Sequence, residues 1–369
     1  MHKNKETFCY IHNNVTKKEN TAKNMYKRVD KSTKYVYNSM VSLNKCLMFM
    51  HNIHQLYIKE IKMAKVFIDG SAGTTGLKIF DLLAGRKDID LIRLPEELRK
   101  DSSARKEAIN SADIVFLCLP DVAAVESVSF VENKNTVVID TSTAHRTNDA
   151  WAYGFPELGN RREKIAASKR IANPGCHASG FLALVEPLVR KGLIANDTAL
   201  SCFSLTGYSG GGKKMIADYE GEGRDVLLGA PRQYGMAQAH KHLPEMQKIG
   251  GLTTAPIFCP IVADYYCGME VTVTLFKKDL KGSVQNIKDV YAEAYNSKIL
   301  HFDEACDEGG FMSAGAIAGR DDMQVCVYGN DERILLVSRF DNLGKGASGA
   351  AIQNMNIVLG VDETTGLKV

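Results

Sequence analysis

Apolar residues after residue 63 fall first into short continuous runs separated by segments with helical spacing. Continuous apolar runs of this length are typical of strands buried on both faces of a parallel sheet. Strands are predicted over residues 65–69, 89–94, 114–119 and 136–140. Helices are predicted between them over residues 77–83, 102–110 and 122–131. This alternation predicts a doubly wound α/β domain of the Rossmann-like, nucleotide-binding kind.

The second half of the chain has a different pattern, because its strand-like runs include stretches that alternate between apolar and polar residues. Such alternation indicates strands with one covered face. These strands are expected over residues 199–205, 270–276, 323–328 and 333–338, and helices over 283–295 and 347–359. We therefore expect an α+β domain with a largely antiparallel sheet, one face of which lies on helices.

Composition changes abruptly at residue 62. All 31 Gly and all 9 Pro lie beyond it, and residues 1–62 hold 12 of the 46 Lys and Arg but only 4 of the 43 Asp and Glu. This extension carries +8 and the remainder −5. Residues 1–35 are expected to be disordered, and residues 41–61 are compatible with a short helix. The expected parts are 1–62, a nucleotide domain of 63–172 plus 341–369, and a catalytic domain of 173–340.

Three interpretations of the extension compete: a start assigned too far upstream, a targeting arm, and a tail that binds nucleic acid or membrane. The segment has one Arg against eleven Lys, whereas a presequence is Arg- and Ser-rich, and its first apolar run comes only at residues 46–50. Met63 stands directly before a predicted strand. We favour a start at Met63.

Several classes of protein are excluded or disfavoured. No run of 18 apolar residues is present, which argues against an integral membrane protein. The nine Cys form no C-x-x-C pair and no zinc-ligand spacing, so reduced thiols in the cytoplasm are expected, with no metal site. The mildly acidic remainder gives no reason to expect nucleic acid as a partner.

A glycine-rich turn follows the first predicted strand, in the segment Asp69-Gly70-Ser71-Ala72-Gly73-Thr74-Thr75-Gly76. Glycines at this point allow a tight turn and the close approach of a pyrophosphate to the N-terminus of the next helix. The spacing is G-x-x-G-x-x-G instead of G-x-G-x-x-G, so a turn without ligand, as in any α/β protein, is the alternative. No acidic residue stands out after the second strand that could accept a hydrogen bond from the ribose hydroxyls of NAD. Arg93, Arg99 and Lys100 lie there instead, which favours the 2′-phosphate of NADP.

Cys176 stands out among the nine cysteines because it follows Asn173-Pro174-Gly175 and precedes an apolar stretch of helical density. A thiol in the first turn of a helix faces unpaired amides, which lower its pKa and favour a thiolate. The alternative is a small buried residue that packs the start of a helix, which is the interpretation for Cys118 and Cys326.

Two further segments supply partners for such a thiol. His240 and His242 are two residues apart, and in an extended chain, with Leu243 held extended by Pro244, their imidazoles point the same way. One of them is a candidate acid/base group; a zinc pair lacks a third ligand, and a plain surface loop is the remaining alternative. The segment 207–214 offers consecutive glycine amides and two cations for a phosphate or carboxylate, or else is a flexible loop.

These motifs, in this order, resemble N-acetyl-γ-glutamyl-phosphate reductases of the short form, and the resemblance runs from Met63 nearly to the C-terminus. The related aspartate-semialdehyde dehydrogenases share the architecture and the Cys/His chemistry. The segments that carry the resemblance are residues 69–77, 140–146, 151–157, 173–176, 207–213, 240–246 and 341–350.

The resemblance implies a fold of the semialdehyde dehydrogenase type and an NADPH-dependent oxidoreductase of arginine biosynthesis. The enzyme would reduce N-acetyl-γ-glutamyl phosphate to N-acetylglutamate 5-semialdehyde and phosphate through a cysteine thioester. Cys176 would be the nucleophile and His242 the acid/base residue, with His240 beside it or on the substrate. The substrate would be bound by Arg146, Asn173, Ser209, Gly210, Gly211, Lys213 and His240. The cofactor would be bound by Gly70, Gly73, Thr74, Thr75, Gly76, Ser142 and Asn342.

The chain departs from the family at residue 177, where an aromatic residue usually follows the nucleophile and this chain has His177. The resemblance also implies a homo-oligomer, either a dimer or a tetramer. Two other functions stay open: an aspartate-semialdehyde dehydrogenase, and a nucleotide-binding regulator that keeps the fold without turnover. Segment 207–214 has no acidic residue for the free ammonium of aspartate semialdehyde, and an intact Cys and His pair disfavours a regulator.

Overall fold

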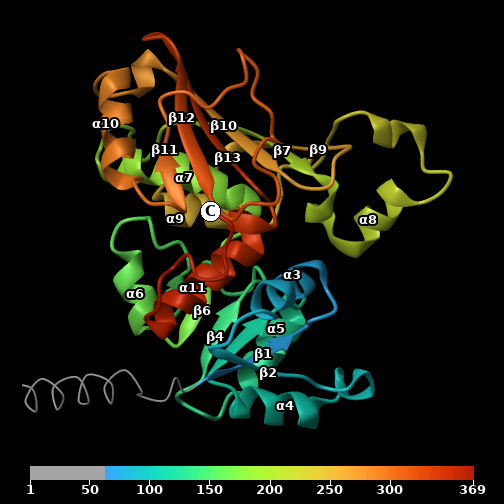
Figure 1. Cartoon of the computed structure of the whole chain (residues 1–369). Helices are drawn as coiled ribbons and strands as arrows, with labels where there is room; N and C mark the ends of the chain where they lie inside the picture. The colour runs from blue at the N-terminus through green and yellow to red at the C-terminus, as the bar shows by residue number, and fades with distance from the viewer. Residues whose placement is uncertain (1–62) are drawn as a thin grey trace, which may run out of the picture. The chain divides into compact units, whose positions relative to one another are not determined.

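The computed structural model describes residues 63–369 of the 369-residue chain, and the predictions for residues 1–62 lie outside this part (Figure 1). Its first sheet is six-stranded and parallel throughout, in the order β2-β1-β3-β4-β6-β5. The predicted parallel sheet is therefore confirmed. Its strands are β1 (Ala64–Asp69), β2 (Ile89–Ile92), β3 (Ile114–Leu117), β4 (Val137–Asp140), β5 (Ala152–Tyr153) and β6 (Arg170–Ala172).

Helices cover both faces of this sheet. Alternate residues of β1 point to opposite sides: Val66 packs with Ile79 and Met355 on one face, whereas Phe67 packs with Ile109 on the other. The first face thus carries the helix after the glycine turn and the C-terminal helix of the chain. The helices of this region are α3 (Thr74–Leu83), α4 (Ser102–Ser111), α5 (Asp121–Ser129), α6 (Arg161–Ala167) and α11 (Gly349–Leu359), with a short 3₁₀ turn at Glu96–Leu98.

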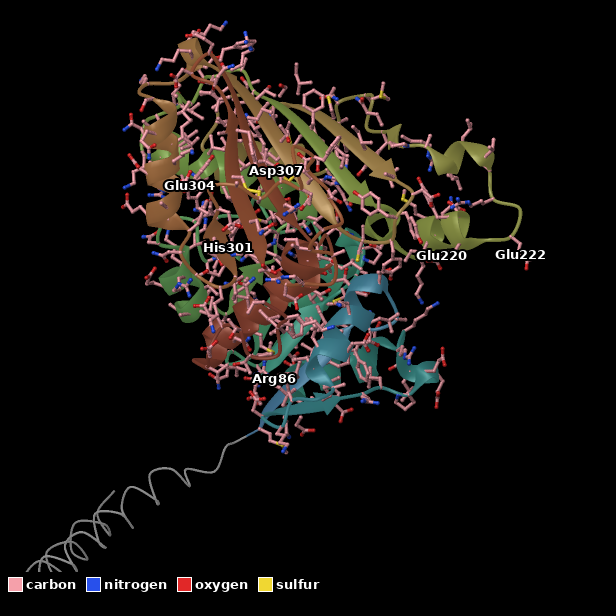
Figure 2. The ribbon with its side chains drawn as sticks, turned by 45° about the horizontal axis from the view of Figure 1, so that its top comes forward. Arg86, Glu220, Glu222, His301, Glu304 and Asp307 are labelled. Carbon is pink, nitrogen blue, oxygen red and sulfur yellow. A yellow bond between two sulfur atoms is a disulfide. The ribbon has the colours of Figure 1, made fainter. Side chains whose placement is uncertain are left out.

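Arg86 fastens the C-terminal helix to this half of the protein (Figure 2). Its guanidinium donates to the carboxylate of Asp88 at 2.9 and 2.5 Å and to Oδ1 of Asn356, in α11, at 2.6 Å. The chain therefore returns to its first sheet after completing the second. This return brings residues 341–350 beside the glycine turn.

The second sheet has seven strands in the order β11-β12-β13-β10-β7-β9-β8. The pairs β11–β12 and β7–β9 are parallel and the other four pairs are antiparallel, so the sheet is mixed but largely antiparallel, as predicted. The strands are β7 (Ser201–Gly207), β8 (Arg232–Gln233), β9 (Ile257–Ala263), β10 (Met269–Phe276), β11 (Leu300–Phe302), β12 (Met323–Gly329) and β13 (Arg333–Phe340).

One face of this sheet packs on α7 (Cys176–Arg190), whose residues are almost all buried. Strand β10 alternates as predicted, with Val271, Val273 and Leu275 buried in the same core cluster as α7. The hydroxyls of Tyr291 and Tyr295 donate to backbone carbonyls of α7 and bind the neighbouring helix to it. The other helices here are α8 (Gly212–Glu220), α9 (Leu243–Gly250) and α10 (Val284–Ala294), with 3₁₀ turns at Tyr208–Gly211, Val226–Gly229 and Lys277–Asp279 and a π-helical turn at Gly344–Ser348.

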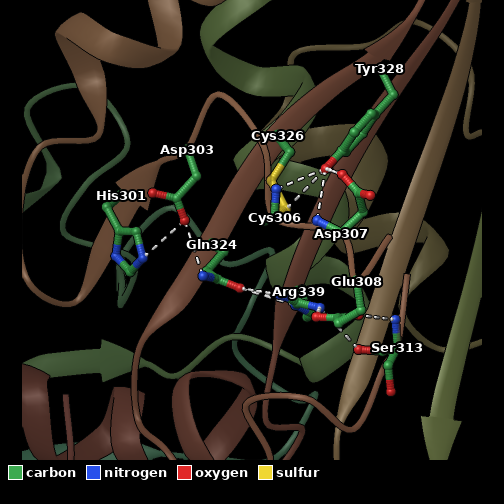
Figure 3. The surroundings of a disulfide bond; sticks show 10 residues. All are labelled: His301, Asp303, Cys306, Asp307, Glu308, Ser313, Gln324, Cys326, Tyr328 and Arg339. Atoms are coloured by element: carbon green, nitrogen blue, oxygen red, sulfur yellow. Dashed lines mark hydrogen bonds and ion pairs between the residues drawn. A yellow bond between two sulfur atoms is a disulfide. The ribbon is translucent and has the colours of Figure 1, made fainter. Parts of the chain in front are cut away.

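A disulfide between Cys306 and Cys326 corrects the expectation that the cysteines are all reduced (Figure 3). Cys326 lies in mid-strand, as the pattern indicated, but the segment after β11 folds back over β12 and brings Cys306 to it. The hydroxyl of Tyr328 accepts the backbone amides of Cys306 and Asp307 at 2.8 and 2.9 Å and fixes this return. The two cysteines are 20 residues apart, a separation that does not indicate a disulfide in the sequence. The other cysteines of residues 63–369, Cys176 among them, are free thiols.

Candidate active site

A single cleft of about 700 Å³ contains most of the residues singled out from the sequence. It reaches from the start of α3, across the ends of β3 and β4, to the start of α7. Gly70 and Gly76 do not line it. Those that line it are Gly73, Thr74, Thr75, Ser142, Arg146, Asn173, Cys176, Ser209, Gly210, Gly211, Lys213, His240, His242 and Asn342.

The glycine turn shapes one end of the cleft. Gly70 has φ +90°, and a Cβ there would overlap the carbonyl of Cys118, while a Cβ on Gly76 would overlap the carbonyl of Gly70. These two glycines therefore allow the close packing of the turn, and Gly73, Thr74 and Thr75 between them line the cleft. The hydroxyl of Thr74, in the first turn of α3, is buried with no hydrogen-bond partner among the described residues. Free helix amides and this hydroxyl suit a phosphate group.

Cys176 is the first residue of α7 and is partly exposed, whereas the residues on either side of it are buried. Burial raises the pKa of its thiol, and the backbone amide of His177 and the charges of Arg146 and Lys241 only partly oppose this effect. The expectation of a lowered thiol pKa is therefore wrong: the low-dielectric surroundings outweigh the helix start. A separate group must accept the proton when this thiol reacts.

His242 lies against the backbone that leads into Cys176. A Cβ on Gly175 would overlap Nε2 of His242 and Nη1 of Arg146. Burial, followed by the positive charge of Arg146, holds the pKa of His242 well below 6.5, so its imidazole is neutral at pH 7. A neutral imidazole beside a thiol can accept its proton.

His240 and His242 come together, but not through the extended backbone that was expected. His242 precedes α9 with helical dihedrals, and Leu243 is the first residue of that helix, with Pro244 in its first turn. The turn places the two imidazoles edge to face, 4.8 Å apart between ring centroids, and the amide of His242 donates to Nδ1 of His240 at 3.2 Å. Proline in a first helical turn needs no amide partner, which explains why it starts a helix here.

Glu245 organises the site and was not singled out from the sequence. Its buried carboxylate accepts the backbone amide of Gly175 at 2.9 Å, the hydroxyl of Tyr153 at 2.6 Å and Nη1 of Arg146 at 3.1 Å. Arg146 also donates to the carbonyls of Asn173 and Thr141, both at 2.9 Å. Glu245 follows His242 by three residues in one helical turn, a spacing that could have indicated a shared face.

Other residues predicted from the sequence line the cleft, but their side chains form hydrogen bonds to other groups of the protein. Asn342 donates to Oγ of Ser209 at 2.9 Å and accepts the amide of Gly268 at 2.9 Å. The side chain of Ser142 donates to Asp140 at 2.7 Å. Asn173 donates to the carbonyl of Ala347 at 3.0 Å. These contacts hold the loops around the cleft in place.

The glycine-rich segment after β7 contributes Ser209, Gly210 and Gly211 in a 3₁₀ turn and Lys213 in the first turn of α8. Lys213 is exposed and faces the cleft. Tyr234 also lines it and was missed, because it lies outside the motif segments, the nearest of which begins at His240. Within residues 63–369 no group of three or more His, Cys, Asp or Glu is arranged to hold a metal ion, and no helix there is long and apolar enough to cross a membrane.

Two family models match the chain. Residues 65–168 match the model described as "Semialdehyde dehydrogenase, NAD binding domain", and residues 176–342 match "Semialdehyde dehydrogenase, dimerisation domain". Solved structures with this fold include aspartate semialdehyde dehydrogenase II from Vibrio cholerae, with a TM-score of 0.64 and 17% identity over 81% of this chain and 99% of that one. The enzyme from Candida albicans, solved with NADP, has a TM-score of 0.59 and 18% identity over 80% of this chain and 98% of that one.

Curated relatives are much more similar in sequence. A protein of Nostoc sp. named "N-acetyl-gamma-glutamyl-phosphate reductase 2" is 42% identical over 321 residues, which cover 82% of this chain and 99% of the relative. The N-acetyl-gamma-glutamyl-phosphate reductase of Chelativorans sp. is 45% identical over 307 residues, which cover 80% and 98%. With this similarity over nearly the whole length of these relatives, the chain belongs to the N-acetyl-γ-glutamyl-phosphate reductase family.

Proposed function

We propose that this protein reduces N-acetyl-γ-glutamyl phosphate to N-acetylglutamate 5-semialdehyde and phosphate, a step of arginine biosynthesis. The observation that carries the proposal is the single cleft that joins the start of α3 to the thiol of Cys176. One end suits the phosphates of a dinucleotide, and the other holds a thiol, a neutral imidazole and exposed amides. An acyl phosphate bound across this cleft meets the groups that its reduction needs.

Cys176 is the proposed nucleophile. Its sulfur attacks the acyl carbon, the bond to phosphate breaks, and a thioester forms while inorganic phosphate leaves. Because burial keeps the thiol protonated, His242 takes the proton as the carbon–sulfur bond forms. After reduction of the thioester, His242 returns the proton as the thiohemiacetal collapses to the aldehyde and the free thiol.

The substrate is proposed to lie between the start of α8 and the start of α7. Gly210, Gly211 and Lys213 offer amides and a cation for the departing phosphate or the α-carboxylate. Arg146 is held by three protein acceptors and still lines the cleft, so it places a fixed positive charge beside the reacting thiol. Asn173, Ser209 and His240 complete the proposed substrate-binding group.

The cofactor is proposed to be NADPH, which supplies the hydride that converts the thioester to the thiohemiacetal. Gly73, Thr74, Thr75, Ser142 and Asn342 would line its site, with Gly70 and Gly76 shaping the turn. The preference for NADP over NAD rests on Arg93, Arg99 and Lys100. Arg93 directly follows β2, which pairs in parallel with β1, so its charge lies at the sheet edge from which the glycine turn starts.

Further proposals concern organisation. The nucleotide domain is proposed to comprise residues 63–172 and 341–369, because α11 packs on the first sheet, and residues 173–340 the catalytic domain. A homo-oligomer, either a dimer or a tetramer, is supported by the match to a dimerisation domain. A cytoplasmic location is proposed because five of the seven cysteines within residues 63–369 are free thiols, Cys176 among them.

The experiment that tests the reaction follows reduced nicotinamide in the reverse direction, with NADP, phosphate and either N-acetylglutamate semialdehyde or aspartate semialdehyde. Turnover of the first substrate is expected, and Cys176→Ser should abolish it. Turnover of aspartate semialdehyde alone would assign the chain to the sister activity. Absence of turnover with both would support the non-catalytic alternative.

A further inference from the structure

His177 connects the core of the second sheet to the cleft. Its Nδ1 lies 2.7 Å from Oγ of Ser204, in β7, and its Nε2 lies 2.8 Å from the hydroxyl of Tyr234. Ser204 and His177 are buried, whereas Tyr234 is half-buried and lines the cleft that holds Cys176. The three side chains form one chain of hydrogen bonds from the protein interior to the substrate side.

The direction of this chain follows from the proton of Ser204. Among residues 63–369 its hydroxyl has one hydrogen-bond partner, Nδ1 of His177. A buried hydroxyl that does not donate loses its bonds to water without replacement, which is costly. Ser204 therefore donates, and Nδ1 accepts.

The hydrogen of the neutral His177 imidazole must then lie on Nε2. If Nδ1 accepts, a neutral imidazole carries its hydrogen on Nε2 and donates it to the oxygen of Tyr234. The oxygen of Tyr234 thus accepts a hydrogen bond from His177, and the proton of its hydroxyl has no acceptor in the described part of the chain. This proton is free to bond to an acceptor in the cleft, which Tyr234 and His177 both line.

We propose that His177 is a positioning residue that fixes Tyr234 as a hydrogen-bond donor to an acceptor oxygen of the bound acyl compound. This inference rests on the proposed function and extends it to a residue pair to which the sequence motifs assign no role. The opposite tautomer of His177 would take the proton of Tyr234 and leave only an acceptor, which repels the carbonyl, carboxylate and phosphate oxygens of the substrate.

Two shifts in pKa agree with this arrangement. Burial lowers the pKa of His177 to about 3, so the imidazole is neutral and must choose one tautomer. Burial also raises the pKa of Tyr234, so its hydroxyl keeps its proton at neutral pH and above. Neither His177 nor Tyr234 therefore changes its protonation state near neutral pH.

The tautomer is tested directly by long-range proton–nitrogen NMR on protein with ¹⁵N-labelled histidine. The His177 signals are assigned by their absence from His177→Gln protein, and they should report a neutral ring with hydrogen on Nε2 at pH 7.5. A ring with hydrogen on Nδ1, or a charged ring, overturns the proposal. This readout needs no turnover, so it stands even if the proposed reaction fails.

The functional consequence is tested with a matched pair of variants. Glutamine places its amide near the position of Nε2 and can still donate to Tyr234, whereas asparagine reaches only the position of Nδ1. We expect His177→Asn to lower kcat/KM about three- to tenfold, the cost of one neutral hydrogen bond, and His177→Gln to recover most of that loss. Equal losses in the two variants would indicate a packing role only and contradict the proposal.

A double-mutant cycle identifies Tyr234 as the group through which His177 acts. Tyr234→Phe should cost about as much as His177→Asn, and the two together no more than either alone. Full additivity would show that His177 acts independently of Tyr234 and would overturn the proposal. Thermal unfolding of each variant checks that it is folded, so that the kinetic constants of folded proteins are compared. If no variant, nor the parent, turns over either semialdehyde, the proposed function fails and the NMR result alone decides this inference.

Discussion

Glu245 accepts the backbone amide of Gly175 at 2.9 Å, and Gly175 is the residue directly before the thiol-bearing Cys176. The same carboxylate binds Arg146 at 3.1 Å. One buried acid thus holds both the start of α7 and the positive charge of the cleft. His242, three residues earlier, lies against the same glycine. The thiol, the imidazole and the guanidinium are positioned as one unit.

Replacing Glu245 with Gln should destabilise the protein strongly. The change leaves the buried guanidinium of Arg146 without its negative partner, a defect that costs about 3–5 kcal/mol of unfolding free energy. Glu293→Gln is the matched control, because its pair with Lys191 is exposed and worth about 0–1 kcal/mol. Urea unfolding of both variants measures the difference. Similar losses in the two would contradict a buried organising role for Glu245.

Gly175→Ala should impair catalysis without backbone strain. Gly175 has φ −80° and ψ 145°, which alanine adopts freely, but its Cβ would displace His242 and Arg146. A shift of about 1 Å in such a group can lower kcat by a factor on the order of 100. Gly85→Ala is the control, since a Cβ there has nothing within 4 Å. Steady-state kinetics should show a large loss in the first variant, and full activity in it would disprove the close contact.

The pH profile should lack an acid limb near the ordinary pKa of histidine. The neutral form of His242 is the active base, and its share falls only as pH falls through a pKa held well below 6.5 by burial and then Arg146. The raised pKa of Cys176 keeps the thiol protonated at neutral pH. Consequently kcat/KM should be flat from about pH 6 to pH 8. An acid limb centred at pH 6.5 or higher would show that His242 titrates normally or is not the base.

Arg93 should contribute to cofactor choice. Arg93→Ser removes a cation expected near a 2′-phosphate, so KM should rise about tenfold for NADP and little for NAD. Arg333→Ser is a control, since this exposed residue lies in the second sheet, where it starts β13. Equal changes in KM for both cofactors would remove the support that Arg93 gives to NADP.

The sequence predicted the elements that are long and apolar better than the short ones. Strands β1, β3, β10 and β13 were expected close to their observed bounds because periodicity reports burial directly. Strands β5 and β8 have two residues each and carry no pattern, and β9 contains Pro260, which argues against a strand.

The candidate site shows the same division between local and long-range information. Cys176 was found because its motif is contiguous, and the two histidines because they are neighbours. Glu245, Tyr234 and the partner of Cys326 were not found, since their roles depend on contacts between residues 20 to 70 positions apart. The thiol pKa was misjudged for the same reason, because burial is a property of the whole fold.

The most direct test of the thioester at Cys176 is the stoichiometry of reduced nicotinamide formed from N-acetylglutamate semialdehyde and NADP before phosphate is added. Without phosphate the thioester cannot be released as acyl phosphate, so we expect a burst of one reduced nicotinamide per Cys176, steady turnover once phosphate is supplied, and neither in Cys176→Ser. Steady turnover from the start without phosphate, or an unchanged burst in Cys176→Ser, would contradict a covalent intermediate at this residue.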